Sequence, residues 1–239
     1  MLFVFIRLST FFATCKNIFP QGTPNIFKVM LCVMMSGIIS INLGISVNVD
    51  SMYLLMLYCI AEFINGLFFG YVVNLAFSSV KIAGNLIDTQ MGLSMANIYD
   101  PQTGTQSTLM QSLFNLFAGT LLFVTNGHHL LLGAVFKSFE IISIGSLPIA
   151  NNLEYVMKIF AKYFCLGFQI AIPVVITLIL SDLILALISR SIPQLNVMII
   201  GMPLKLLIGI IIVFVLIPVL SSSIKEMIAA LPKILNGYI

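Results

Sequence analysis

The sequence predicts an all-α membrane protein with about five to seven long helices. Hydrophobic residues make up 60% of the 239 residues, charged residues make up only 8%, and the mean hydropathy is +1.13. Globular domains have about 25% charged residues, and a soluble fold with so apolar a surface would aggregate. Long apolar runs separated by turn residues predict the helices, because a helical span needs about 20 apolar residues.

The expected helices follow one another from the N-terminus. A short first helix is expected over residues 1–15, where Arg7 interrupts the apolar run and no small-residue cleavage site follows, which favours a retained helix over a signal peptide. Pro173 predicts a kink in the fifth of the longer runs. These longer runs are 29–47, 52–77, 109–124, 130–147, 164–188 and 197–220.

No hydrophilic domain, linker or internal repeat separates these runs, so one membrane domain is expected over residues 1–239. Its N-terminal part, 1–125, and its C-terminal hairpin part, 126–239, are not expected to be independent. Lysine and arginine do not alternate between the connections, so the positive-inside rule gives no topology.

The composition argues against several classes of function. Eleven basic minus eight acidic residues give a net charge of +3, too weak and scattered for nucleic acid and better suited to lipid headgroups. The four cysteines form no C-x-x-C pair, which favours buried thiols. Adjacent His128 and His129 should point to different faces of a helix, so no metal or cofactor site is expected. No catalytic motif suggests an enzyme.

A polar segment lies between apolar runs and begins Gly84-Asn85-Leu86-Ile87-Asp88. We expect a helix-breaking element that is buried in protein or lines an aqueous path, because unsatisfied polar groups cost several kcal/mol in hydrocarbon. Two interpretations of Asp88 stay open. It is either a pore-facing or proton-linked acid, or a structural partner for a base such as Lys81.

Small and polar residues recur every four positions in five segments, which places them on one face of each helix. Such faces let helix backbones approach and let amides hydrogen-bond across the contact. They exceed what six helices need among themselves, which predicts a larger helical assembly; the alternative is an ordinary polytopic protein with internal packing only. Asp182 is also predicted to pair with Lys205 on the neighbouring hairpin arm. The polar or packing positions are Glu62, Gly66, Gly70, Asn74, Asp88, Gln111, Asn115, Asp182 and Lys205.

Motifs along nearly the whole chain are similar to one family. They include residues 83–96, Tyr99-Asp100-Pro101, Gly104-Thr105-Gln106, Asn126-Gly127-His128, Lys137-Ser138-Phe139, Pro173-Val174, Asp182-Leu183, residues 192–197 and residues 201–205, with Arg7, Pro20, Pro24 and Lys28 near the start. Together they resemble the FliR family, the flagellar biosynthetic proteins of the type III secretion export gate. From the resemblance we expect the chain to begin within the first helix of the family pattern.

The resemblance implies a structural subunit of the flagellar export gate that forms part of the conduit for unfolded flagellar subunits. It implies a hetero-oligomer with FliP-like and FliQ-like subunits, beside FlhB-like and FlhA-like export proteins, in the bacterial inner membrane at the flagellar basal body. The implied fold consists of kinked helical hairpins stacked into a cone set largely above the bilayer plane. Virulence-type secretion subunits are similar and stay an alternative.

The resemblance also implies a loop that plugs the pore. By position this plug loop consists of Tyr99, Asp100, Pro101, Gln102, Thr103, Gly104, Thr105 and Gln106. A rival class of function is a secondary transporter of a small solute, with Asp88 and Asp182 as coupling acids. A third is an assembly scaffold without contact to the lumen.

Overall fold

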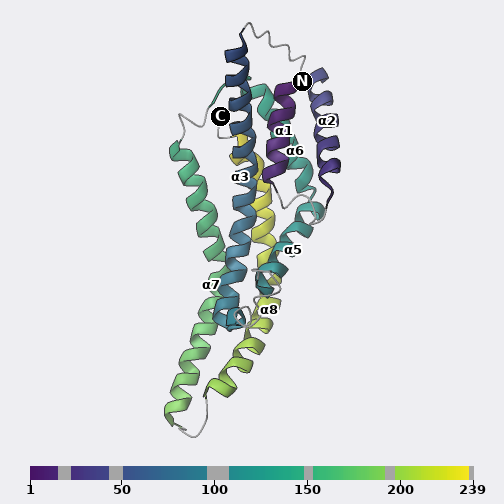
Figure 1. Cartoon of the computed structure of the whole chain (residues 1–239). Helices are drawn as coiled ribbons and strands as arrows, with labels where there is room; N and C mark the ends of the chain where they lie inside the picture. The colour runs from purple at the N-terminus through teal and green to yellow at the C-terminus, as the bar shows by residue number, and fades with distance from the viewer. Residues whose placement is uncertain (16–22, 43–50, 96–107, 148–152, 192–196, 237–239) are drawn as a thin grey trace. The chain divides into compact units, whose positions relative to one another are not determined.

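The computed structural model describes residues 1–15, 23–42, 51–95, 108–147, 153–191 and 197–236. In this part of the chain it contains seven α-helices, one 3-10 turn and no strand, which confirms the predicted all-α fold (Figure 1). The elements are α1 (Leu2–Thr14), α2 (Asn25–Asn42), α3 (Met52–Met91), η1 (Leu93–Met95), α5 (Leu109–Val124), α6 (Gly127–Ile141), α7 (Leu153–Ser191) and α8 (Val197–Asn236).

Four of the described helices are long and apolar enough to cross a membrane: α2, α3, α7 and α8. A fifth span results if α5 and α6 count as one broken crossing. The 13 residues of α1 extend over only about 20 Å, less than the roughly 30 Å of a hydrocarbon core. Helix α1 is therefore too short to cross the hydrocarbon core as a straight helix, which agrees with the short apolar run in the sequence.

The polar segment after residue 77 is helical, and the prediction that it breaks the helix is wrong for residues 84–91. Helix α3 continues to Met91, because Val80, Ala83, Ile87 and Met91 recur at helical spacing and are buried. The helix ends only before Gly92, whose φ of +80° is the left-handed conformation that terminates helices. A backbone turn closes there, with Gly92 N–H donating to the carbonyl of Thr89.

The two C-terminal helices are longer than the apolar runs that predicted them. Helix α7 begins at Leu153, before the predicted start at 164, and Pro173 lies inside it without ending it. Helix α8 begins at Val197 as predicted but extends to Asn236, past the predicted end at 220. The predicted start of α7 and the predicted end of α8 were wrong because charged and polar residues interrupt the apolar runs there. Such residues are still compatible with a helix.

The structure forms two compact units, each of which is discontinuous in the chain. The first unit comprises Met1–Phe77, Leu122–Lys162 and Met227–Ile239, and the second comprises Ser78–Leu121 and Tyr163–Glu226. Each unit takes residues from both sides of residue 125. The single domain over 1–239 stays a prediction.

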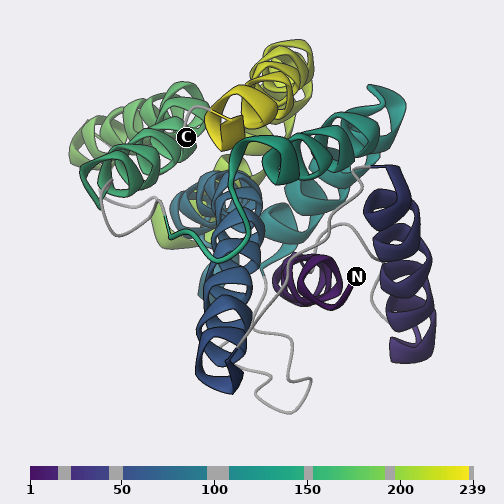
Figure 2. The same ribbon diagram turned by 90° about the horizontal axis from the view of Figure 1, so that it is seen from above.

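In the first unit, α1 lies among α2, α3 and α6, which Figure 2 shows along the axis of α1. Its side chains Val4, Leu8 and Phe11 are completely buried. A 13-residue helix is marginal by itself in water, so packing contributes to its order.

Two glycines one turn apart let α1 approach α3 closely. A Cβ atom at Gly66 would overlap the carbonyl oxygen of Arg7 and the hydroxyl of Thr10. A Cβ atom at Gly70 would lie 2.9 Å from the carbonyl oxygen of Phe11. The predicted small-residue face of α3 therefore packs against α1 of the same chain, through close backbone contact.

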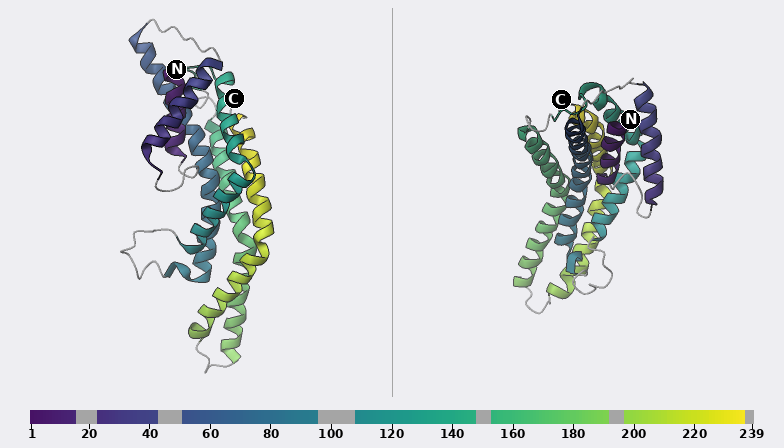
Figure 3. Two further views of the ribbon diagram at one scale, coloured as in Figure 1. Left: turned by 90° about the vertical axis from the view of Figure 1, so that its right-hand side faces the viewer. Right: turned by 45° about the horizontal axis from the view of Figure 1, so that its top comes forward.

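In the second unit, α7 and α8 form a hairpin whose arms run side by side (Figure 3). Two glycines again mark where helices touch the end of α3. A Cβ atom at Gly167 would lie 2.7 Å from the carbonyl oxygen of Ser79, and one at Gly209 would lie 2.5 Å from Cε of Met91. The end of α3 is thus packed by both hairpin arms.

Substitution of Gly66 by alanine should detach α1 from α3. The added methyl group meets backbone atoms of Arg7, which cannot move aside as a side chain can, so we expect a loss of about 1–3 kcal/mol of stability. Thermal unfolding of the detergent-solubilised protein measures this loss.

Gly133→Ala is the matched control, because Gly133 is also helical and a Cβ atom there meets nothing within 4 Å. Alanine favours the helix over glycine by up to about 1 kcal/mol, so this variant should unfold at the same or a higher temperature. Equal effects of the two substitutions would contradict the assigned contact.

Candidate functional site

The most completely buried polar cluster joins Arg7 of α1 to Glu62 of α3. Arg7 Nε donates to Glu62 Oε2 at 2.5 Å, and Arg7 Nη2 donates to Glu62 Oε1 at 2.9 Å. Both side chains are 0% exposed. This two-bond arrangement fixes the orientation of both side chains, since the planar guanidinium matches the carboxylate.

The remaining donors and acceptors of this pair are satisfied by the chain around α6. Arg7 Nη1 donates to the carbonyl and the hydroxyl oxygen of Ser138, both at 3.2 Å, and the N–H of Gly145 donates to Glu62 Oε1 at 3.3 Å. The guanidinium carbon also lies 4.2 Å from the centre of the Phe139 ring. The cluster therefore links α1, α3, α6 and the turn after α6.

Sequence reasoning placed Glu62 on a packing face but missed its partner. A signal was available, because Arg7 is the single charged residue of an apolar helix and Glu62 is the single charged residue in the first turns of α3. Opposite charges in apolar helices generally pair, since either one alone is costly to bury. Asn65, also missed, donates from Nδ2 to the carbonyl of Ser146 at 3.0 Å.

A second buried contact lies in the other unit, between the end of α3 and the start of α5. Asp88 is 0% exposed, and its Oδ2 accepts the backbone N–H groups of Met110 at 2.8 Å and Gln111 at 3.1 Å. The structure gives Asp88 backbone partners at the start of α5, and the pairing with Lys81 stays a prediction. The partner is a helix N-terminus, whose free N–H groups and dipole favour an anion.

Asp182 and Lys205 form the ion pair predicted between the hairpin arms. Lys205 Nζ lies 2.5 Å from Asp182 Oδ1, with the lysine side chain 22% and the aspartate side chain 43% exposed. Neighbouring side chains such as Leu183 and Leu204 are apolar and exposed as well. The pair thus lies on an apolar face that the described part of the chain leaves exposed.

Two predicted positions, Asn74 and Asn115, are half-buried. Oδ1 of Asn115 has no hydrogen-bond partner within the described residues. All eight residues of the predicted plug loop, Tyr99 to Gln106, lie outside the described residues.

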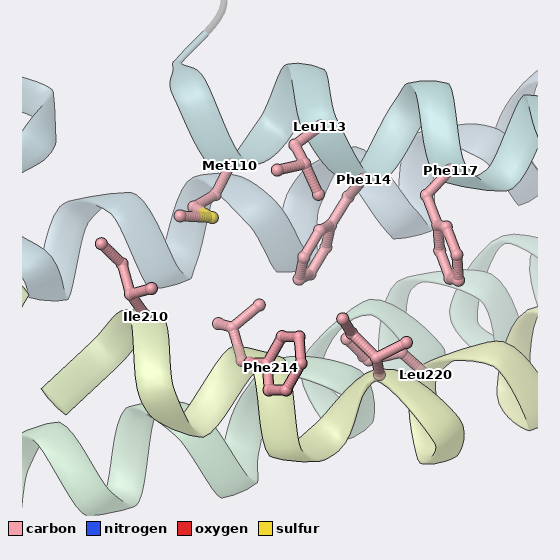
Figure 4. Close-up of a pocket in the computed structure, with 9 residues that line it drawn as sticks. Met110, Leu113, Phe114, Phe117, Ile210, Phe214 and Leu220 are labelled. Atoms are coloured by element: carbon pink, nitrogen blue, oxygen red, sulfur yellow. The ribbon is translucent and has the colours of Figure 1, made fainter. Parts of the chain in front are cut away.

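A pocket of about 200 Å³ opens between α5 and α8 within the second unit. Figure 4 shows Phe114 and Phe117 pointing from α5 toward α8, which carries Phe214. All of its lining side chains are apolar, so no side chain there could orient a polar solute. Its chemistry suits an apolar group.

The two histidines do not point to different faces as expected. Their rings lie side by side at the start of α6, with centroids 4.2 Å apart. Among the residues that the structure describes, no group of three or more His, Cys, Asp or Glu side chains could hold a metal ion.

Comparison with known proteins connects this geometry to one family. The sequence pattern of the family described as bacterial export proteins, family 1, matches residues 1–231. The relatives found by similarity carry the name flagellar biosynthetic protein FliR.

Three of these relatives cover almost all of the chain. The protein from Bacillus subtilis (strain 168) is 34% identical over 231 residues, which are 94% of this chain and 88% of the relative. The protein from Aquifex aeolicus (strain VF5) is 29% identical over 243 residues, 100% of this chain and 93% of the relative. The protein from Escherichia coli (strain K12) is 27% identical over 236 residues, 98% and 90% respectively.

Removal of one member of the Arg7–Glu62 pair should destabilise the protein strongly. Arg7→Met leaves the Glu62 carboxylate buried without its cation, which costs about 3–5 kcal/mol. The double variant Arg7→Met with Glu62→Leu removes both charges and should recover most of the lost thermal stability.

Lys158→Met is the control, because it breaks the ion pair between Lys158 and Glu154, whose side chains are 71% and 83% exposed. This substitution should leave the melting temperature almost unchanged. A double variant no more stable than Arg7→Met would contradict the coupling.

Proposed function

Because this chain belongs to the bacterial export proteins of family 1, we propose that it is a structural subunit of the flagellar type III protein export gate. The chain is a multi-pass membrane protein of the flagellar export apparatus. The observation that carries the proposal is the family match over residues 1–231, together with FliR relatives that cover nearly the full chain.

In the proposed gate the chain forms part of the conduit for unfolded flagellar subunits. FliP-like and FliQ-like subunits complete the hetero-oligomer, and FlhB-like and FlhA-like export proteins lie beside it in the bacterial inner membrane at the basal body. The relatives described above carry flagellar names, which favours the flagellar system over its virulence-type homologue. Energy for transport comes from other components, and no catalytic step is assigned to this chain.

The surface of the second unit supports a place among other helices. Gln169 is exposed on α7, near exposed apolar side chains such as Ile172 and Ile176. Lipid tails offer no partner for its amide, whereas a neighbouring helix can supply donors and acceptors. A face that combines apolar and polar groups in this way suits a protein partner better than bulk lipid.

The geometry favours the gate over a secondary transporter. Two acids were candidates for coupling a solute to an ion. The Asp88 carboxylate accepts hydrogen bonds from the first turn of α5, and Asp182 forms an ion pair with Lys205. The pocket between α5 and α8 offers only apolar side chains, which do not suit a polar metabolite.

The assembly is tested by purification from detergent. We expect the chain to elute in a fixed ratio with two other small membrane proteins, because its polar helix faces need partners. Mass determination of the intact complex measures the ratio. A monodisperse lone chain that binds a small solute would favour the transporter instead.

The plug loop is tested by deletion of residues 102–106 in the assembled complex. We expect small ions to leak across the membrane while the amount of assembled gate stays the same, because the loop closes the lumen at rest. Cellular ion conductance and native gels measure the two quantities.

The matched control replaces residues 148–152, another connecting segment of five residues, with glycine and serine. This variant should keep the conductance of the unmodified gate. Unchanged conductance after deletion of 102–106, with normal assembly, would remove the plug role. Crosslinking of a trapped export substrate to Thr103 would distinguish a gate from a scaffold without lumen contact.

A further inference from the structure

The apolar pocket between α5 and α8 is elongated along both helices. In Figure 4, Met110 and Ile210 lie at one end of it, and Phe117 and Leu220 lie at the other. From Ile210 to Leu220 the pocket follows about 15 Å of α8, because a helix rises about 1.5 Å per residue. Its shape is therefore that of a groove, and we call it the α5–α8 groove.

The lining of the α5–α8 groove suits hydrocarbon and excludes water. All of its lining side chains are aliphatic, aromatic or thioether groups, and its volume is about 200 Å³. An apolar protein cavity of about 150 Å³ with similar lining stays dry and binds benzene. Water is unfavourable in such a space, since the lining side chains offer it almost no hydrogen bonds. A hydrocarbon group is therefore the expected occupant.

Helix α3 closes the groove at the end near Ile210. The preceding residue, Gly209, lies against Met91, because a Cβ atom at Gly209 would be 2.5 Å from Cε of Met91. Met110, at the same end, is buried, and its backbone N–H donates to Asp88. A long ligand that enters the groove consequently has to end there.

Along its side the groove is open. Its lining residues Leu113, Ile210 and Phe214 are exposed, and α8 exposes further apolar side chains such as Ile211 and Val215 beside it. Helix α8 is also one of the helices that are long and apolar enough to cross a membrane. An opening bounded by such a surface faces acyl chains when the helix lies in a bilayer.

The other end of the groove coincides with the end of the apolar run of α8. Leu220 is the last residue of that run, and three serines follow it directly. Ser221 and the exposed Lys225 lie four residues apart and hence on one helix face, where a hydroxyl and an ammonium group suit a phosphate. The exposed Glu226 lies about 100° further round the helix.

We propose that the α5–α8 groove binds one acyl chain of a membrane phospholipid. The methyl end of this chain lies at Met110 and Ile210, and the phosphate lies near Ser221 and Lys225. The apolar lining selects hydrocarbon, the closed end limits how far the chain enters, and the polar turn after Leu220 sets its direction. The lipid fills space between two helices that would otherwise lack packing contacts. This binding requires only the groove and the membrane, not the export function.

Photolabelling of the complete complex tests the binding, in vesicles of phosphatidylethanolamine and phosphatidylglycerol. The probe is phosphatidylglycerol that carries a diazirine in its acyl chain. A diazirine at the methyl end should label the chain around Met110 and Ile210, and one close to the glycerol should label it around Phe117 and Leu220. Mass spectrometry of peptides locates the labels.

A variant that fills the groove separates bound lipid from bulk lipid. Val213 is buried in the lining, so Val213→Phe should reduce labelling at Met110 and Ile210 about tenfold, a typical cost of overpacking a filled site. Val219→Phe is the matched control, because Val219 is exposed on the same helix outside the groove, and it should change nothing. If Val213→Phe does not assemble, Ile217→Phe at the open side gives the same comparison.

Three results overturn the inference. Equal labelling in Val213→Phe and Val219→Phe means that lipid touches only the outer surface. Unlabelled groove residues beside a labelled Val219 mean that a side chain of a partner subunit fills the groove. No label on either side of α8 means that this part of the helix stands above the bilayer plane. All three leave the proposed function intact, since co-purification and the deletion of residues 102–106 test it separately.

Discussion

A guanidinium and a carboxylate completely removed from solvent constrain the whole first unit. Neither Arg7 nor Glu62 can be buried alone at reasonable cost, so α1 and α3 must pack where the two side chains meet. The same pair also forms hydrogen bonds with Ser138 of α6 and with the N–H of Gly145. Helix α6 and the turn after it must therefore pack beside this pair. Gly66 makes the meeting possible, because no larger residue leaves room for the backbone of Arg7.

The second unit also contains a buried carboxylate whose charge must be compensated, but the compensating group is of another kind. Asp88 is buried as completely as Glu62, but a helix N-terminus compensates it instead of a basic side chain. The donors to this carboxylate are backbone N–H groups in the first turn of α5 itself.

Both units leave much apolar surface uncovered, and this surface is consistent with a subunit of a larger export apparatus. The hairpin arms α7 and α8 expose aliphatic side chains together with the Asp182–Lys205 pair. The small-residue face of α3 was expected to contact other subunits, but Gly66 and Gly70 pack against α1 of the same chain. Part of the surface predicted for assembly is thus used internally, and the uncovered arms are the stronger argument for partners.

Apolar runs, turn residues and hairpin neighbours are local signals, and they were enough to predict the all-α membrane fold, the bounds of α5, the start of α3 at Met52 and the Asp182–Lys205 pair. The long sequence motifs were enough to identify the family. In contrast, the continuation of α3 through Gly84, the Arg7–Glu62 pair and the Asp88 cap on α5 became known from the folded structure. These partners lie 55 and 22 residues apart, and nothing in a local pattern specifies which distant helix brings a donor to a buried charge.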